Sequence, residues 1–139
     1  MIIFKKDLTF KTKGMTDILD ITPHVRQEVE ESGVRDGVVI IFVPGSTAGV
    51  TTIEYESGVL QDLVEAIDRL APQSIHYHHD ARWGDGNGFA HVRSALLGPS
   101  LCIPFCSRRL QLGTWQQIVL IDFDNRPRQR DIFLQILGE

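Results

Sequence analysis

The apolar run at residues 38–43, Val-Val-Ile-Ile-Phe-Val, restricts the fold of this chain more than any other segment. The run is short and rich in β-branched side chains, which favours a strand over a buried helix. Residues 132–137 form a second such run, and in both runs the two alternating faces are apolar. A chain of 139 residues has few helices to cover both faces. We therefore expect two central strands, with one face buried against another subunit.

The remaining hydrophobic pattern alternates irregularly between strands and helices. A helix is expected from Thr22, as its cap, with Pro23 at its first position and Gly33 just past its end. Two more helices are expected at 57–70 and 88–97, and further strands at 2–12, 16–20, 50–54, 74–79, 101–105, 110–112 and 115–124. Strands outnumber helices and several connections are hairpin-like. The sequence predicts a single compact α+β domain over residues 1–139, with largely antiparallel sheets and two to three helices.

Bulk properties narrow the class of protein. The formal net charge of -4 argues against a nucleic-acid partner, which would favour a basic excess. No apolar run has the length of a membrane span, and the first lysines follow a very short apolar stretch, unlike a signal peptide. We therefore expect a cytoplasmic protein with no membrane partner. Cys102 and Cys106 are too far apart along one strand to form a disulfide, and we expect both to be small buried fillers.

Four of the five histidines lie between residues 76 and 91, among glycines and aspartates. Imidazole is suited to proton transfer near neutral pH and to metal binding, so this segment predicts a site. If 74–79 is a strand, His79 shares the inward face with Tyr77, while His76 and His78 point outward. Asn87 and His91 lie on one side of a helix start, where free amides next to Gly88 would favour a phosphate or carboxylate.

Three other segments offer polar groups. The loop 44–49 could present the hydroxyls of Ser46 and Thr47 to an anion. Gln116 and Asp122 lie among apolar residues on one face of a strand, which indicates a polar pocket wall. Arg126, Arg128 and Arg130 are expected to form a solvated turn, although one of them could face a phosphate.

Several of these segments occur together in the order and spacing of one family. They are residues 37–48 (GVVIIFVPGSTA), 77–80 (YHHD), Asn87 with 90–91 (AH), 98–100 (GPS) and 112–116 (LGTWQ). The chain resembles the YjbQ-like family, also called the secondary thiamine-phosphate synthase family, over nearly its whole length. The resemblance implies a homotrimer with a polar cleft near the subunit contacts. Many members have a histidine where this chain has Gly45, so a three-histidine metal centre cannot be assembled from the matching positions alone. His79 and His91 would need a carboxylate such as Glu54 or Asp80 to complete a metal site.

The resemblance also implies a weak ability to join the pyrimidine and thiazole halves of thiamine phosphate. The expected transferase would act on a small phosphorylated heteroaromatic substrate, with a divalent metal (Mg²⁺ or Zn²⁺) as the cofactor. The expected catalytic residues are His79, His91, Asn87, Glu54 and Gln116, and any metal would bind His79, His91 and Glu54. The expected substrate-binding residues are Ser46, Thr47, Tyr77, Gly88, Ser100, Thr114 and Trp115. Two alternatives stay open: a metal-dependent hydrolase that uses the two histidines and a carboxylate, and a non-catalytic binder of a phosphorylated metabolite.

Overall fold

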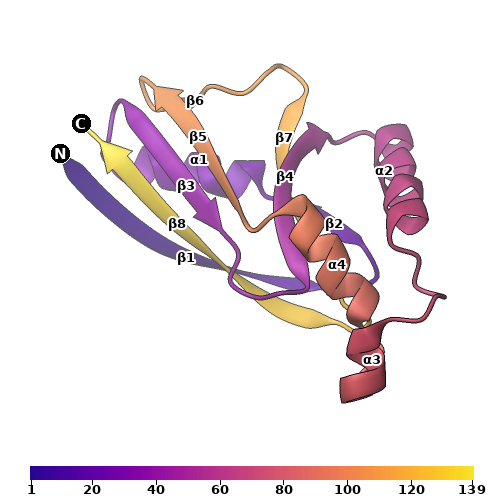
Figure 1. Cartoon of the computed structure of the whole chain (residues 1–139). Coiled ribbons are helices and arrows are strands. Elements are labelled where there is room, and N and C mark those ends of the chain that lie inside the picture. The colour runs from indigo at the N-terminus through magenta and orange to yellow at the C-terminus, as the bar shows by residue number, and fades with distance from the viewer.

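Eight strands and four helices make up the computed structural model, which describes residues 1–139 (Figure 1). The strands are β1 (Ile2–Thr12), β2 (Asp17–Asp20), β3 (Gly37–Phe42), β4 (Ala48–Glu54), β5 (Ser100–Cys106), β6 (Arg109–Leu110), β7 (Gln116–Asp122) and β8 (Arg128–Gly138). The helices are α1 (Thr22–Glu31), α2 (Ser57–Leu70), α3 (His78–Trp83) and α4 (Gly88–Leu97). No helix combines the length and the apolar character that a membrane span requires.

The strands form two sheets in which every pairing is antiparallel. The larger sheet has the order β1-β8-β3-β5-β6 and the smaller one the order β2-β7-β4. The C-terminal strand β8 pairs with β1 on one side and β3 on the other, so the last strand of the chain is an interior strand of the larger sheet. These pairings confirm the prediction of an α+β fold with antiparallel sheets.

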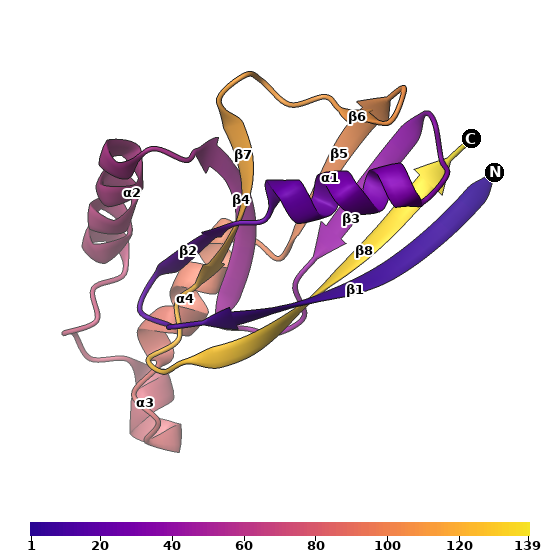
Figure 2. The same ribbon diagram turned by 180° about the vertical axis from the view of Figure 1, so that it is seen from behind.

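The main core fills the space between the two sheets and α1. Val39 and Ile41 of β3 are fully buried there, as are Val25 and Val29 of α1. Figure 2 shows α1 lying across this side of the larger sheet. The opposite face of β3 has no helix over it: Val38 and Ile40 are half-buried and Phe42 is 40% exposed. The expectation that residues 38–43 are buried on both faces is therefore not met within one chain.

Residues 74–79 do not form the predicted strand. Turn residues follow α2, and His78 begins α3, so the chain has four helices instead of the two to three predicted. The physical reason lies in the sheet: β4 pairs with β7 along one edge, and α4 packs against β4. The smaller sheet therefore has no place for another strand in this region.

Two smaller predictions are also wrong. Ile21 occupies the N-cap position of α1, and the Thr22 hydroxyl instead accepts a hydrogen bond from the Ile118 amide at 2.7 Å, which joins the helix to β7. Cys102 and Cys106 are exposed free thiols, because they lie on the face of β5 opposite the buried Ile103. Gly33 follows the end of α1 with φ of 77°, as predicted.

Candidate functional site

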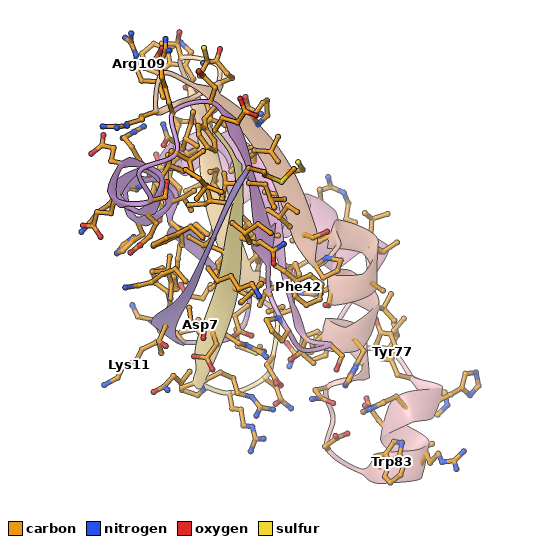
Figure 3. The ribbon with its side chains drawn as sticks, turned by 90° about the vertical axis from the view of Figure 1, so that its left-hand side faces the viewer. Asp7, Lys11, Phe42, Tyr77, Trp83 and Arg109 are labelled. Atoms are coloured by element: carbon orange, nitrogen blue, oxygen red, sulfur yellow. The ribbon has the colours of Figure 1, made fainter.

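The junction between α3 and α4 forms the polar centre of the site. Gly84 ends α3 in the left-handed conformation (φ 72°), and the chain then turns into α4 at Gly88. The Gly88 amide donates a hydrogen bond to Asp80 Oδ1 at 2.8 Å. A Cβ at position 88 would lie 2.7 Å from the Tyr77 Cβ, so only glycine allows this contact. Figure 3 shows Tyr77 beside α4 and Trp83 at the outer end of α3.

This hydrogen bond corrects the prediction of a free anion seat at the start of α4. The Asp80 carboxylate already takes the Gly88 amide, while the amides of Ala90 and His91 bond to the Asn87 carbonyl. Asn87 holds the N-cap position, but its side chain makes no capping hydrogen bond. A carboxylate of the chain itself therefore occupies the place where a ligand anion was expected.

The structure brings His79 and His91 together, as the sequence predicts. Their ring centroids are 4.3 Å apart and the ring planes are tilted by 37°. His79 Nδ1 lies 3.3 Å from Asp80 Oδ1 and 3.3 Å from Asp85 Oδ1. His76 and His78 are exposed and lie outside this cluster, with rings that contact each other edge to face. The prediction set these two histidines aside on the basis of a strand that does not exist, yet the outcome is the same.

A buried network of ion pairs lies next to the site, at the end of β7. Asp122 is fully buried at the end of β7 and accepts two hydrogen bonds from Arg130, at 2.7 and 2.8 Å, and one from Thr12 at 2.6 Å. Burial alone raises the pKa of Asp122, but the hydrogen bonds from Arg130 and Thr12 outweigh it and hold the pKa below its ordinary value. Arg130 is only 11% exposed, so the prediction of a solvated arginine turn is wrong at this position.

Asp124 connects three separate segments to one carboxylate. It accepts hydrogen bonds from Thr47 Oγ1 at 3.1 Å, Asn87 Nδ2 at 3.3 Å and Arg128 Nε at 2.8 Å. Burial raises the pKa of Asp124, but the hydrogen bonds from the Asn125 amide and from these side chains lower it by more than burial raises it, so the net shift is downward. The loop before β4, the start of α4 and the turn before β8 are thereby held together.

Sequence reasoning treated Asp122 as part of a pocket wall and missed the role of Asp124. A signal was present, because Asp122 and Asp124 are matched by Arg128 and Arg130 at the same two-residue spacing across a short turn. Alternate residues of a strand lie on one face, so two acids and two arginines with this spacing can pair across a hairpin.

A hollow of about 260 Å³ lies next to His91. Its lining residues are Gly45, Ser46, His91, Ser94, Ala95 and Pro99. Ser46 is exposed and available to a ligand, whereas the Thr47 hydroxyl is buried and occupied by Asp124 and Arg130. Gly45 borders the same hollow.

A second group of predicted residues lies at the far end of β4 and β7. Glu54 pairs with Gln116 at one end of these strands, while Ala48 pairs with Asp122 at the other. Six residues of strand span roughly 20 Å. Glu54 therefore cannot complete a metal site with His79 and His91 of the same chain. The structure offers Asp80 and Asp85 in its place.

This far end of β4 and β7 has a hollow of its own. Trp115 is 71% exposed and borders a hollow of about 410 Å³, which is also lined by Asp20, Glu54, Tyr55, Glu56 and Gln117. Gln116 accepts a hydrogen bond from the Gly113 amide and donates one to Thr52 Oγ1, while Thr114 is exposed nearby.

Two predicted substrate-binding residues lie elsewhere. The Tyr77 hydroxyl donates to the Pro72 carbonyl at 2.6 Å, so its polar end is used within the chain. Ser100 pairs with Phe42 in the larger sheet and is exposed there.

Fold and site together define a class: an α+β protein with two antiparallel sheets and a cluster of histidines and aspartates at a junction between two helices. The family model described as "UPF0047 protein YjbQ-like" matches residues 6–139. The chain belongs to this UPF0047 family of YjbQ-like proteins, which confirms the resemblance drawn from the sequence motifs.

Individual relatives agree over nearly the whole chain. A UPF0047 protein of Archaeoglobus fulgidus is 39% identical over 131 residues, covering 94% of this chain and 99% of the relative. The UPF0047 protein YugU of Bacillus subtilis is 34% identical over 134 residues, covering 96% and 98%. A crystal structure of a YbjQ-like protein of unknown function from Sulfolobus solfataricus P2 superposes with a TM-score of 0.94 at 33% identity, covering 99% of both chains. A hypothetical protein from Aeropyrum pernix K1 superposes with a TM-score of 0.90 at 33% identity, covering 98% and 99%.

Proposed function

We propose that the protein is an enzyme that acts on a small phosphorylated substrate with the help of a divalent cation. The observation that carries this proposal is the cluster of His79, Asp80 and Asp85, whose potential ligand atoms all lie within 4.8 Å of one another. His91 lies against His79 and beside the hollow at Ser46. The proposed metal ligands therefore lie next to an imidazole that borders the hollow.

Two of the separations in the cluster are compatible with ligands that share one metal ion. Two ligand atoms bound about 2.1 Å from one ion at tetrahedral or octahedral angles lie about 3.0–3.4 Å apart. His79 Nδ1 is 3.3 Å from a carboxylate oxygen of Asp80 and of Asp85. One imidazole and two carboxylates suit Zn²⁺ or Mn²⁺, while Mg²⁺ prefers oxygen ligands throughout. These three side chains would leave coordination positions open for a substrate.

The reaction that the family resemblance implies is the formation of thiamine phosphate from a pyrimidine pyrophosphate and a thiazole phosphate. The bond from the pyrimidine methylene to pyrophosphate breaks, its electrons stay with pyrophosphate, and the thiazole nitrogen forms the new bond. A bound cation would neutralise negative charge on the leaving group. In this proposal His91 would donate a proton to that group, and Ser46 would donate a hydrogen bond.

A metal-dependent hydrolase is the second candidate, because a metal held by these three side chains would keep open coordination positions. In that case His91 would accept a proton from the attacking water. A protein that binds a phosphorylated metabolite without catalysis is the third candidate, and it uses the same cluster without turnover.

Metal binding is tested first by isothermal titration calorimetry of the metal-free protein with Zn²⁺, Mn²⁺ and Mg²⁺. We expect Asp85→Asn to weaken binding at least tenfold. The matched control is Asp62→Asn, which removes an exposed carboxylate of α2 that forms no ion pair. Equal binding by wild type and Asp85→Asn would refute the cluster as a metal site.

Turnover is tested by chromatography of the two thiamine precursors with the metal-loaded protein, and of phosphate esters in a parallel reaction. We expect His91→Ala to lower the rate of thiamine phosphate formation 100-fold or more while leaving metal affinity within a few fold. His76→Ala, at an exposed position outside the cluster, should behave like wild type. Hydrolysis of the esters without coupling supports the second candidate, and ligand binding without either reaction supports the third.

We also propose that the protein is a homotrimer that buries the open face of the larger sheet. On this face Val38, Ile40 and Phe133 are half-buried and Phe42 is 40% exposed, with no helix above them. Apolar side chains on central strands favour burial against a partner. Light scattering should give three times the chain mass of 15.7 kDa, and Ile40→Asp should give the monomer mass. A monomeric wild type at micromolar concentration would overturn this proposal.

A further inference from the structure

Asp85 is the least firmly held of the three proposed metal ligands. Its side chain is 50% exposed, compared with 28% for His79 and 29% for Asp80. His79 and Asp80 belong to α3, and the hydrogen bond from the Gly88 amide fixes the Asp80 carboxylate further. Asp85 lies instead in the turn between α3 and α4, so the position of its carboxylate depends on the conformation of that turn.

The backbone of this turn does little to fix its own conformation. Gly84 and Gly86 flank Asp85, and both are left-handed, with φ of 72° and 68°. Glycine adopts this conformation at low cost, but it also has more alternative conformations than any other residue. No backbone-to-backbone hydrogen bond holds residues 85 and 86. A change in the turn would move the Asp85 carboxylate away from His79.

One side chain from a distant part of the sequence holds the turn. Asn125 Nδ2 donates a hydrogen bond to the Asp85 carbonyl oxygen at 2.9 Å. The opposite orientation of the amide would bring two oxygens together, so this contact fixes the orientation. Figure 1 and Figure 2 both show the chain between β7 and β8 beside the junction of α3 and α4.

The backbone of Asn125 belongs to a well-anchored part of the molecule. Its amide donates a hydrogen bond to Asp124 Oδ1 at 2.8 Å, and Asp124 is fully buried. The Asp124 carbonyl oxygen in turn accepts a hydrogen bond from the Met15 amide at 2.7 Å. The Asn125 side chain therefore joins a turn with few constraints to a turn that is fixed on both sides.

We propose that Asn125 is a positioning residue for the metal site. It holds the turn so that the Asp85 carboxylate, with Oδ1 at 3.3 Å from His79 Nδ1, stays within reach of an ion bound by His79. This role rests on the proposed function, because it concerns affinity for the cation that the function requires. If only a fraction of the molecules has Asp85 in place, the apparent dissociation constant of the metal rises in inverse proportion to that fraction.

Isothermal titration calorimetry with Zn²⁺ and Mn²⁺ compares the metal affinity of wild type and Asn125→Ala. We expect Asn125→Ala to bind about three- to tenfold more weakly, the factor that one hydrogen bond of ordinary strength supplies. In the Asp85→Asn background the same substitution should have no further effect, because Asn125 acts through the Asp85 carboxylate. The control Gln129→Ala removes an exposed side-chain amide that forms no hydrogen bond, and it should bind metal like wild type.

The hydrogen bond to the turn is measured without any metal, by ¹⁵N relaxation of the Gly86 amide. We expect its order parameter to fall from about 0.85 in wild type toward about 0.6 in Asn125→Ala. The Gly113 amide, which bonds to Gln116 Oε1 in another turn, should keep its wild-type value. An unchanged order parameter of Gly86 would show that Asn125 does not hold the turn and would overturn the proposal.

The titrations separate this role from the proposed function. If Asp85→Asn weakens metal binding but Asn125→Ala does not, the metal site stands and the positioning role fails. An equal loss of affinity on Asn125→Ala in the wild-type and Asp85→Asn backgrounds also overturns the role, because Asn125 would then act by another route. If wild type binds no cation although Asn125→Ala loosens the turn, Asn125 holds the turn and the proposed function fails by itself.

Discussion

Replacing Asp124 by asparagine tests whether the buried charge network holds the site together. The substitution keeps the size of the side chain but removes the charge that pairs with Arg128 and partly with Arg130. It also places an amide NH₂ among donors, because Thr47, Asn87 and Arg128 all donate to this carboxylate.

The magnitude follows from burial. Asp124 is fully buried, and removing one partner of a buried ion pair costs about 3–5 kcal/mol. Arg128 is 33% exposed and can regain water, so we expect the lower end of this range, about 3 kcal/mol. A protein of this size is stable by only about 5–15 kcal/mol, so the loss is readily measured.

The assay is urea unfolding followed by circular dichroism at one fixed protein concentration, since any oligomer makes stability depend on concentration. Asp62→Asn serves as the control, because a change at an exposed carboxylate without an ion pair should stay within about 0.5 kcal/mol. A loss below about 1 kcal/mol for Asp124→Asn would refute the conclusion that this carboxylate ties the three segments together.

Three further predictions concern acid, a tight glycine and a buried arginine. The pKa values of Asp122 and Asp124 lie below the ordinary 3.8, so their stabilising effect should be complete above that pH and be lost as the pH falls through the lowered values; acid titration of Asp124→Asn should show a smaller loss than wild type. Gly88→Ala should lower the free energy of unfolding in urea by about 1–3 kcal/mol, because the new methyl group would clash with Tyr77. Gly113→Ala should lower it much less, because a methyl group there makes only ordinary van der Waals contacts. Arg93→Met should lower the free energy of unfolding by about 2 kcal/mol, because the guanidinium loses its hydrogen bonds to Ala71, Thr16 and Asp68. An unchanged thermal midpoint would contradict this role.

The part of the site that was predicted from the sequence rests on local spacing. His91 follows Asn87 by four residues, and this distance places both at the first turn of a helix whatever the rest of the fold does. The meeting of His79 with His91 was predicted as well, although the expected strand at 74–79 is a turn and a short helix.

The error at residues 74–79 shows that a local pattern does not reveal whether a strand has a partner to pair with. Alternating Ile75, Tyr77 and His79 suit a strand, but a strand needs a free edge to pair with, and α4 packs against β4 where such an edge would lie. The separation of Glu54 from the histidines has the same origin. Glu54 ends β4 roughly 20 Å along the strand from Ala48, at the end far from Asp122.

The sequence by itself determined the α+β class, because hydrophobic periods of two and of 3.6 residues are local properties, and it determined which segment has the histidines. Asp80 was one of two carboxylates that the sequence offered for them, and only the tertiary structure decided between Asp80 and Glu54 and added Asp85. Asp80 follows His79 directly in sequence, whereas Asp85 lies beside His79 because Gly84 turns the chain back, and Asp124 reaches Thr47 and Asn87 across more than 30 residues of sequence. Hydrogen bonds and ion pairs act over a few ångströms of space, and distance along the chain does not set that separation.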